Sequence, residues 1–373
     1  MGSDVNARLS QLRSRRKGET TGIALDSLNK SYTADALDIE DWERRGSASQ
    51  HWTRYAIGAM QSVGKKYTEV SVTTGNRVAD QLRERLAKVN IDAVFKLQGS
   101  VPLDVHIRRV SDVDVLAITT EFLTYRVSGV KSKRGGYSSP SPRSSSEVLR
   151  ELRIQIEADL DNAFPSAKVD KTGAKAVKVS GASLPRSVDV VPGHWHDTEA
   201  YQESGRQADR AVKIYNKRTG ETIENLPFLH IERVASRCDS IKGGLRKAIR
   251  LCKNVKADAD RDIQLSSYDI AAVMYHADTN ALRMGQFSEL AVLSETQRHL
   301  DALYRDQDTA RKLLVPDGSR AIFDSAEKIG WLYQLSLEMD ELLDNVYQEC
   351  FPYMASSGVM RSAKRSSINT LAV

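Results

Sequence analysis

The sequence predicts an α+β protein of two lobes, with a mixed α/β first lobe and an all-helical second lobe. At 373 residues the chain is too long for one small hydrophobic core. Short β-branched apolar runs occur between residues 92 and 223, and they are typical of buried strands. Beyond Leu229 the apolar residues recur at steps of three and four, which is the spacing of helices. We therefore place the first lobe at residues 1–228 and the second at residues 229–353.

The composition is that of an ordinary globular protein. Hydrophobic residues make up 40% and charged residues 28% of the chain, and no uninterrupted apolar run approaches the length of a membrane span. The basic N-terminal segment has no apolar block, so we expect no secretory signal and no membrane partner, and the cytoplasm is the expected compartment. Three scattered cysteines, Cys238, Cys252 and Cys350, lack metal-ligand spacing, so neither disulfides nor structural zinc is expected. The net charge of +5 suits an enzyme that holds nucleotides and is far below that of a protein that coats nucleic acid.

The first lobe opens with a polar segment at residues 23–47, which we expect to lie on the surface. Helical spacing then dominates from residue 52 to residue 89, with an expected interruption near residues 73–76, where the sequence reads Thr-Thr-Gly-Asn. Two apolar runs, at residues 92–97 and 112–118, predict strands.

A segment rich in Ser, Gly, Pro and basic residues follows at residues 128–146. Its composition predicts a flexible, solvated loop, and a basic flap over a triphosphate or a nucleic-acid contact is the alternative. After it the pattern predicts a helix at residues 147–164, strands at 176–179 and 187–191, and a hairpin at 213–223.

The second lobe is predicted to be helical throughout. Its helical segments are expected at residues 241–255, 267–283, 290–311 and 326–347. The small, polar residues 354–373 predict a mobile C-terminal tail.

The most informative chemistry lies at Gly99-Ser100 and at the pair Asp112 and Asp114. Because alternate side chains of a strand share a face, the two carboxylates point the same way and can hold cations between them. Paired carboxylates with open positions suit a Mg²⁺ ion that must also hold a substrate phosphate. The Gly-Ser turn just upstream leaves backbone and hydroxyl donors free to approach a phosphate. The combination predicts phosphoryl or nucleotidyl transfer.

A third carboxylate, Asp189, lies within the apolar strand predicted at 187–191. A buried carboxylate is costly unless it is paired or binds a metal. By itself such a residue is more often a surface residue or a salt-bridge partner. Together with Asp112 and Asp114 it completes a triad of the kind that carries two Mg²⁺ ions, with Mn²⁺ as a substitute. One ion would activate an attacking hydroxyl, and the other would hold the triphosphate and stabilise the leaving pyrophosphate.

From about residue 52 to residue 350 the chain resembles the cGAS/DncV-like nucleotidyltransferases of the DNA polymerase β superfamily, which are related to oligoadenylate synthases and cyclic GMP-AMP synthase. The resemblance implies a polymerase-β-like palm lobe with a mixed sheet at residues 1–228, and a helical lobe that closes the nucleotide cleft at 229–353. It assigns catalysis and metal binding to Asp112, Asp114 and Asp189, and the donor phosphates to Gly99 and Ser100.

A second block narrows the resemblance to the second-messenger branch. It consists of residues 245–253, which end on Lys253, and of the Ser-Ser-Tyr run that contains Ser267 and Tyr268. Carried over by position from cyclic GMP-AMP synthase, Lys253 and Ser267 would contact the triphosphate and Tyr268 would stack on a base. The chemistry fits, because an ammonium and a hydroxyl suit phosphate and an aromatic face suits a purine. The alternative is that Lys253 is a solvated helix residue and that the two serines merely cap a helix.

The chain also departs from the family. Many relatives have a threonine in the loop before the aspartate pair, where this chain reads Asp104-Val105-His106. The zinc-binding cluster of the animal DNA sensor has no counterpart, so no DNA-sensing zinc module is expected. His194 and His196 would share a face of an extended segment, but without further ligands nearby they are expected to be structural histidines.

The resemblance implies an enzyme that makes a cyclic oligonucleotide second messenger from nucleoside triphosphates, with ATP as the expected one, in bacterial anti-phage (CBASS) signalling. Its expected partners are a downstream effector, reached through the cyclic product, and a regulatory protein. Two rival functions remain. One is a transferase that makes linear oligonucleotides or adds a nucleotide to RNA or protein, as a toxin would. The other is a non-catalytic nucleotide-binding scaffold.

Overall fold

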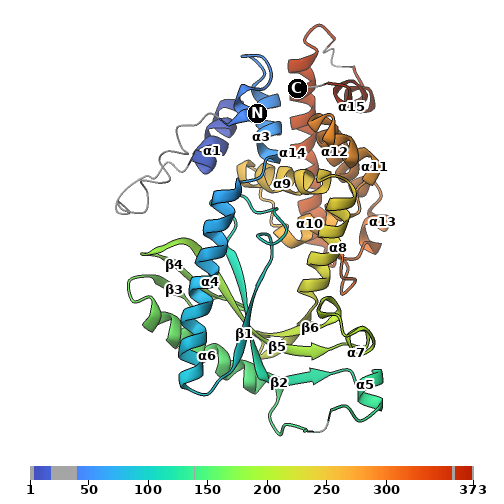
Figure 1. Cartoon of the computed structure of the whole chain (residues 1–373). Helices are drawn as coiled ribbons and strands as arrows, with labels where there is room; N and C mark the ends of the chain where they lie inside the picture. The colour runs from blue at the N-terminus through green and yellow to red at the C-terminus, as the bar shows by residue number, and fades with distance from the viewer. Residues whose placement is uncertain (1–3, 18–39, 138, 355–357, 372–373) are drawn as a thin grey trace. The chain divides into compact units, whose positions relative to one another are not determined.

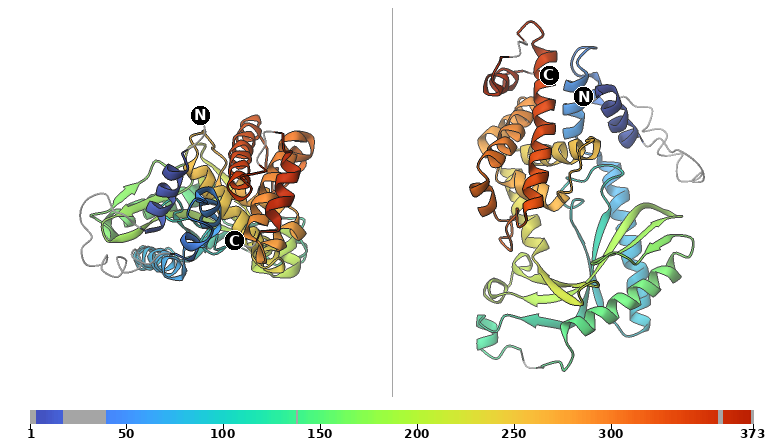
Figure 2. Two further views of the ribbon diagram at one scale, coloured as in Figure 1. Left: turned by 90° about the horizontal axis from the view of Figure 1, so that it is seen from above. Right: turned by 180° about the vertical axis from the view of Figure 1, so that it is seen from behind.

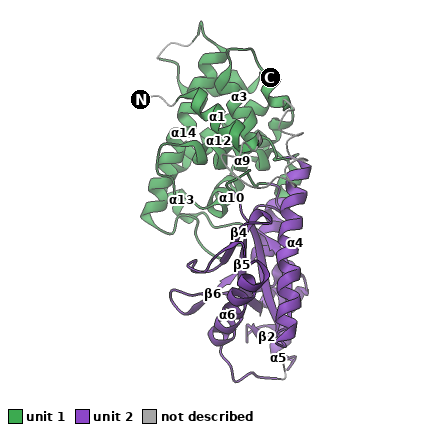
Figure 3. Cartoon of the chain, turned by 90° about the vertical axis from the view of Figure 1, so that its left-hand side faces the viewer, with its two compact units in different colours: residues 1–63, 105–110, 236–373 green, residues 64–104, 111–235 purple. Residues whose placement is uncertain are grey.

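The computed structural model describes residues 4–17, 40–137, 139–354 and 358–371, and the chain forms two compact units (Figure 3). Unit 1 comprises residues 1–63, 105–110 and 236–373, and unit 2 comprises residues 64–104 and 111–235. The N-terminal 63 residues thus belong to unit 1, whereas the sequence places them with the 1–228 lobe. Polar contacts tie this N-terminal part to the rest of unit 1, because the Arg15 guanidinium and the Tyr55 hydroxyl both donate hydrogen bonds to the buried Asp258.

Unit 2 is built on one mixed sheet, which contains seven strands in the described part of the chain (Figure 1). The strands are β1 (Ala93–Gln98), β2 (Val113–Tyr125), β3 (Lys168–Asp170), β4 (Val177–Gly181), β5 (Leu184–Asp197), β6 (Ala211–Asn216) and β7 (Glu221–Asn225). Their order is β1-β2-β5-β4-β3, and β6 pairs with both β5 and β7. Only the central pair β2 and β5 is parallel among these pairings; the others are antiparallel.

Two long helices of unit 2, α4 (Lys65–Lys88) and α6 (Ser145–Ala163), cover the same face of this sheet (Figures 1 and 2). Their apolar stripes and the valines of β2, β4 and β5 form one buried cluster, which includes Leu82, Leu149, Val115 and Val188. In the first part of β2, Val113, Val115 and Ala117 thus point toward the helices, and the even-numbered residues between them point to the opposite face.

The predicted helix break near residues 73–76 is wrong, because α4 is continuous there and the break lies at residues 61–64. Gly75 serves helix–sheet packing instead. A Cβ at this position would lie 2.9 Å from both Leu97 Cδ2 and Val113 Cγ1. Thr74 is accommodated in the helix because its hydroxyl donates to the Val70 carbonyl at 2.7 Å.

The remaining elements of unit 2 are short. They are α5 (Val130–Lys133), α7 (Glu199–Ser204) and the 3₁₀ turn η2 (Gln207–Asp209), and α8 (Pro227–Ser240) spans the boundary to unit 1. The segment predicted as a loop at residues 128–146 contains the one-turn helix α5. It ends where Ser144 and Glu147 form a reciprocal capping box at the start of α6.

Unit 1 is mainly helical. Its elements are α1 (Val5–Lys17), η1 (Asp41–Arg44), α3 (His51–Met60), α9 (Gly244–Asp258), α10 (Ser267–Tyr275), α11 (Thr279–Arg283), η3 (Met284–Gln286), α12 (Glu289–Arg305), α13 (Gln307–Lys312), α14 (Ala326–Cys350) and α15 (Arg361–Asn369). The buried stripe predicted from Ile241 to Val255 is confirmed, since Leu245, Ala248 and Cys252 of α9 have no exposed surface.

The predicted mobile tail is corrected at residues 361–369, which form helix α15. This helix docks mainly by charge. Arg361 pairs with Asp340 at 2.8 Å, Lys364 pairs with Asp344 at 2.8 Å, and Ile368 is the one fully buried apolar side chain of the helix. A helix with a single buried apolar residue looks like a polar tail in sequence.

The other predicted strands and helices are confirmed in type. The helices predicted at 267–283 and 290–311 are, however, each divided into two, α10 and α11 and then α12 and α13, and strands β2 and β5 continue to Tyr125 and Asp197, beyond the predicted ends at 118 and 191. The prediction for residues 23–47 lies largely outside the described residues, which resume at residue 40. Within the described ranges, no helix combines the length and hydropathy that crossing a membrane requires. The three cysteines are free, and Cys238 and Cys252 are buried.

Candidate functional site

The aspartates of unit 2 meet at the centre of the sheet because β2 and β5 are parallel neighbours in register. Asp114 lies directly opposite Asp189, and the buried partners Val113–Val188 and Val115–Val190 flank them. The same row continues to Gln98 on β1 and to Lys178 on β4. Because side chains in register share a face, Asp114, Asp189 and Lys178 project from the face opposite α4 and α6.

Asp112, two residues before Asp114, is held by two donors from neighbouring strands. Lys178 Nζ lies 2.5 Å from Asp112 Oδ2, and the Ser187 hydroxyl donates to Asp112 Oδ1. Lys178 Nζ is also 4.0 Å from Asp189 Oδ1. One ammonium therefore contacts two carboxylates of the predicted triad.

The pKa values of Asp189 and Lys178 are both raised in this group, for different reasons. Burial raises the pKa of Asp189, and the repulsion from Asp112 adds to this, while the Lys178 charge works against both. Desolvation would lower the pKa of Lys178, but its hydrogen bond to Asp112 and the charges of Asp189, Asp112 and Asp114 outweigh it, so that the pKa is raised. Lys178 is therefore an ammonium at neutral pH.

Gly99 brings its backbone directly against Asp114. Its φ of +74° is left-handed, and a Cβ at this position would lie 2.1 Å from Asp114 Oδ2. No other residue type fits there without moving the carboxylate. Ser100 follows in the same turn and is half-buried. The Gly-Ser turn and the aspartates, 13 positions apart at Gly99 and Asp112, are thus neighbours in unit 2.

This donor set fits a hard divalent cation. Carboxylate oxygens are the preferred protein ligands of such ions, and a cation already stands between Asp112 and Asp189. Within the described ranges, however, no group of three or more His, Cys, Asp or Glu side chains is placed to hold a metal ion as it stands. Asp112 would have to exchange a protein donor for the ion.

Lys253, Ser267 and Tyr268 belong to unit 1 and lie on α9 and α10. Lys253 is not a solvated helix residue, since it is only 3% exposed and its Nζ donates to the Val105 carbonyl at 2.9 Å. This bond holds the segment 105–110, which the sequence left without a role, inside unit 1. Arg108 of the same segment donates to the Val63 carbonyl at 2.8 Å.

The serine pair of α10 divides into a capping residue and an exposed one. Ser266 is the N-cap, and its hydroxyl accepts from the Asp269 backbone N–H at 3.0 Å. Ser267 is exposed at the first helical position. The Tyr268 hydroxyl donates to Asp317, and the Arg320 guanidinium lies over the Tyr268 ring at 5.4 Å. The Val315–Arg320 segment thus supports Tyr268.

Comparison with known proteins identifies the family of this chain. No family model matches the chain. A protein of Yersinia aleksiciae named cyclic dinucleotide synthase CdnE is 44% identical over 359 residues, which cover 92% of each chain. A c-di-GMP synthase of a Lachnospiraceae bacterium is 32% identical over 275 residues, 67% of this chain and 77% of that protein. The chain is a cGAS/DncV-like nucleotidyltransferase.

Solved structures agree with this membership. The STING-associated CdnE c-di-GMP synthase of Capnocytophaga granulosa superposes on the nucleotidyltransferase with a TM-score of 0.69 at 27% identity, over 92% of this chain and 99% of that one. The c-UMP-AMP synthase CdnE of Rhodothermus marinus, at 17% identity and a TM-score of 0.57, shares the fold. The predicted polymerase-β-like architecture, a mixed sheet with a separate helical part, is confirmed.

The nucleotidyltransferase has two polar residues at its aspartates that the sequence did not point to, Lys178 and Ser187. Lys178 lies between Val177 and Val179, which are both buried. A single lysine within an apolar strand is visible in the sequence and could have indicated a functional residue. What the sequence could not supply is the pairing of β4 with β5, which places that cation opposite Asp189.

His194 and His196 are engaged within unit 2, as expected of structural histidines. The ring of His194 is paired with Ser145 and with the Trp195 carbonyl, and His196 Nδ1 lies 2.8 Å from the Thr124 hydroxyl. Burial lowers the pKa of both histidines to about 4, so they are neutral at pH 7.

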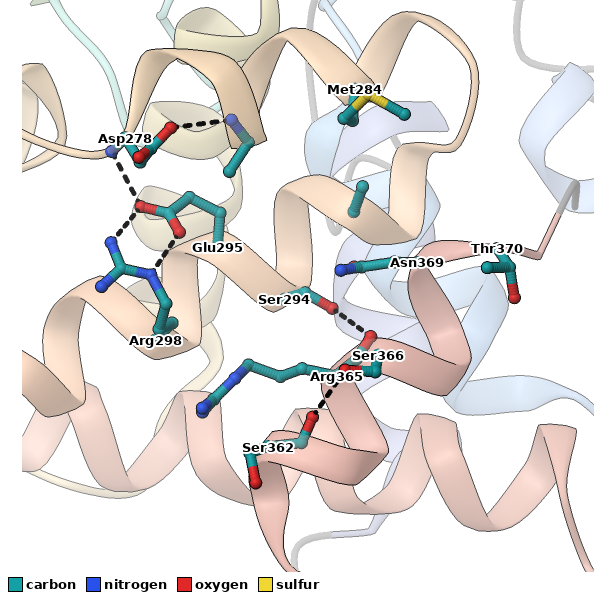
Figure 4. Close-up of a pocket in the computed structure, with 12 residues that line it drawn as sticks. Asp278, Met284, Ser294, Glu295, Arg298, Ser362, Arg365, Ser366, Asn369 and Thr370 are labelled. Carbon is teal, nitrogen blue, oxygen red and sulfur yellow. Dashed lines mark hydrogen bonds and ion pairs between the residues drawn. The ribbon is translucent and has the colours of Figure 1, made fainter.

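A pocket of about 520 Å³ lies in unit 1 between α11, α12 and α15 (Figure 4). None of the predicted site residues lines it. Two of its charged side chains are bonded within the protein, because Glu295 accepts a hydrogen bond from Arg298 Nε at 2.6 Å and Arg365 donates to the Gln297 side chain at 2.6 Å.

Proposed function

We propose that this nucleotidyltransferase joins two nucleoside triphosphates into a cyclic dinucleotide that acts as a second messenger on a downstream effector. The observation that carries the proposal is the in-register pair Asp114 and Asp189, with Asp112 beside it and the Gly99 turn against Asp114. Two relatives, at 32% and 31% identity, are named c-di-GMP synthases, so GTP is the first substrate to test beside ATP.

In this proposal the three aspartates hold divalent cations, Mg²⁺ first and Mn²⁺ as a substitute. Bound there, such ions would lower the pKa of an attacking ribose hydroxyl and neutralise charge on the triphosphate. Asp189 also helps to accept the hydroxyl proton, because burial gives it a raised pKa and hence greater basicity than an ordinary carboxylate.

The remaining site residues act on the nucleotide itself. The backbone at Gly99 and the Ser100 hydroxyl hold the donor phosphates, since the turn leaves their donors accessible. Ser267 contacts the triphosphate through its exposed hydroxyl, and Tyr268 stacks on a base. Lys253 contacts the triphosphate after its Nζ has left the Val105 carbonyl, to which it now donates.

The experiment is product formation from labelled ATP, GTP, UTP and CTP, singly and in pairs, with Mg²⁺ and with EDTA. Asp112→Ala and Asp114→Ala should lose product while keeping the melting temperature within a few degrees. Asp161→Ala, which removes an exposed carboxylate of α6 in the same unit, is the matched control and should keep full activity. A fully active Asp112→Ala/Asp114→Ala double variant would refute the mechanism.

A further inference from the structure

Lys178 is built into the aspartate face by the alternation of β4. Its neighbours Val177 and Val179 are fully buried among the residues packed under α4 and α6. The side chain between them must therefore project from the opposite face, where the register places it beside Asp189. The strand pairing therefore fixes the position of the Lys178 side chain, which is not a surface lysine that reaches an aspartate through a chance rotamer.

Lys178 is also placed to compete for a specific oxygen. Its Nζ contacts Asp112 Oδ2 at 2.5 Å, while Asp112 Oδ1 already accepts from Ser187. The side chains of Lys178, Asp112 and Asp189 are 40%, 28% and 23% exposed, so these charges are partly shielded from water and interact more strongly than free surface ions. A divalent cation at Asp112 would have to displace Nζ or share the carboxylate with it, against its charge.

We propose that Lys178 is the internal counter-ion of the aspartate triad and sets the affinity of this site for divalent cations by competing with them for Asp112. The inference rests on the proposed function, because it takes the triad as the metal site. Lys178 is in this sense a positioning residue that acts through Asp112. When it is engaged it offsets the repulsion among the three carboxylates, and when a divalent cation binds it releases Asp112.

The test measures Mn²⁺ binding by titration calorimetry on the full chain without nucleotide, after removal of metals by chelation. Lys178→Met removes the ammonium and keeps much of the stem. It should bind Mn²⁺ roughly three- to ten-fold more tightly than wild type, which is the scale of a partly exposed ion pair. Lys178→Arg, which keeps the charge, should stay close to wild type. Lys168→Met makes the same change of net charge on the neighbouring strand β3, where Lys168 pairs with Ser180 and not with an aspartate of the triad, and should also stay within about two-fold.

A second measurement separates this role from a merely structural one. In EDTA, Lys178→Met should melt below wild type because three carboxylates then face one another without a cation, and saturating Mn²⁺ should remove that difference. Unchanged or weaker Mn²⁺ binding by Lys178→Met, with the wild type binding normally, would overturn the inference and leave the proposed function standing. A wild-type chain that binds no Mn²⁺ would overturn the metal site of the proposed function together with the inference.

Discussion

Gly99→Ala gives the sharpest test of the site geometry. The new Cβ would lie 2.1 Å from Asp114 Oδ2 and 3.0 Å from Asp114 Cγ. Carbon and oxygen do not approach closer than about 3 Å, so the Asp114 carboxylate must retreat by about 1 Å. A displacement of that size at a catalytic group is expected to lower kcat about 100-fold. Placing alanine at a φ of +74° also destabilises the fold by about 1–2 kcal/mol.

The control is Gly220→Ala in the β6–β7 hairpin of the same unit. Gly220 has a φ of +71°, and an added Cβ would meet no atom within 4 Å. Both variants therefore carry the same backbone strain, and only Gly99→Ala moves an aspartate. The assay is steady-state product formation with Mg²⁺, with melting temperature measured in parallel. We expect both melting temperatures to fall by about 2–4 °C and only Gly99→Ala to lose activity. If Gly99→Ala keeps more than half of the wild-type rate, or Gly220→Ala loses as much, the geometry assigned to Asp114 is wrong.

Three further predictions concern stability. Burial holds the pKa of His299 at about 4, below its usual 6.5, so between these pH values the unfolded chain binds a proton that the folded chain does not, and stability falls as pH falls. In urea titrations between pH 7 and pH 5, the free energy of unfolding of His299→Gln should fall by about 2 kcal/mol less than that of the wild type. Equal falls would contradict this prediction. Asp344→Asn weakens the ion pairs that hold α15, so hydrogen exchange of residues 361–369 should speed up while the melting temperature barely changes, and unchanged exchange would show that the pairs do not hold the helix. Gly75→Leu should destabilise the protein by about 1–3 kcal/mol or more, because its Cβ already meets Leu97 and Val113 at 2.9 Å, whereas Gly330→Leu, with open space on α14, should not.

Much of the site could be predicted from the sequence because the informative patterns lie within single strands. The period of two puts Asp112 and Asp114 on one face, and the apolar run around Asp189 makes a carboxylate there unusual. The resemblance to a family then joined the three residues. Their register, with Asp114 opposite Asp189, depends on which strands pair, and no single strand records that.

The parts that the sequence did not predict depend on contacts between distant residues. Gly75 looks like a helix breaker, but its place is fixed by the side chains of β1 and β2. Helix α15 looks like a polar tail because ion pairs to α14 supply its docking. Lys178 looks like an ordinary strand lysine until β4 is paired with β5. In each case the local pattern is real and a tertiary partner decides its meaning.

The central claim is that the aspartates of unit 2 catalyse closure of a cyclic dinucleotide. The most direct measurement is mass spectrometry of the reaction products after phosphatase treatment, with GTP, ATP and their mixture as substrates. We predict a Mg²⁺-dependent product with the mass of two nucleoside monophosphates less two waters, which survives phosphatase because it has no terminal phosphate, and which Asp114→Ala does not make. Linear oligonucleotide products, which lose their terminal phosphates on phosphatase treatment, would contradict the account, and so would an active Asp114→Ala chain.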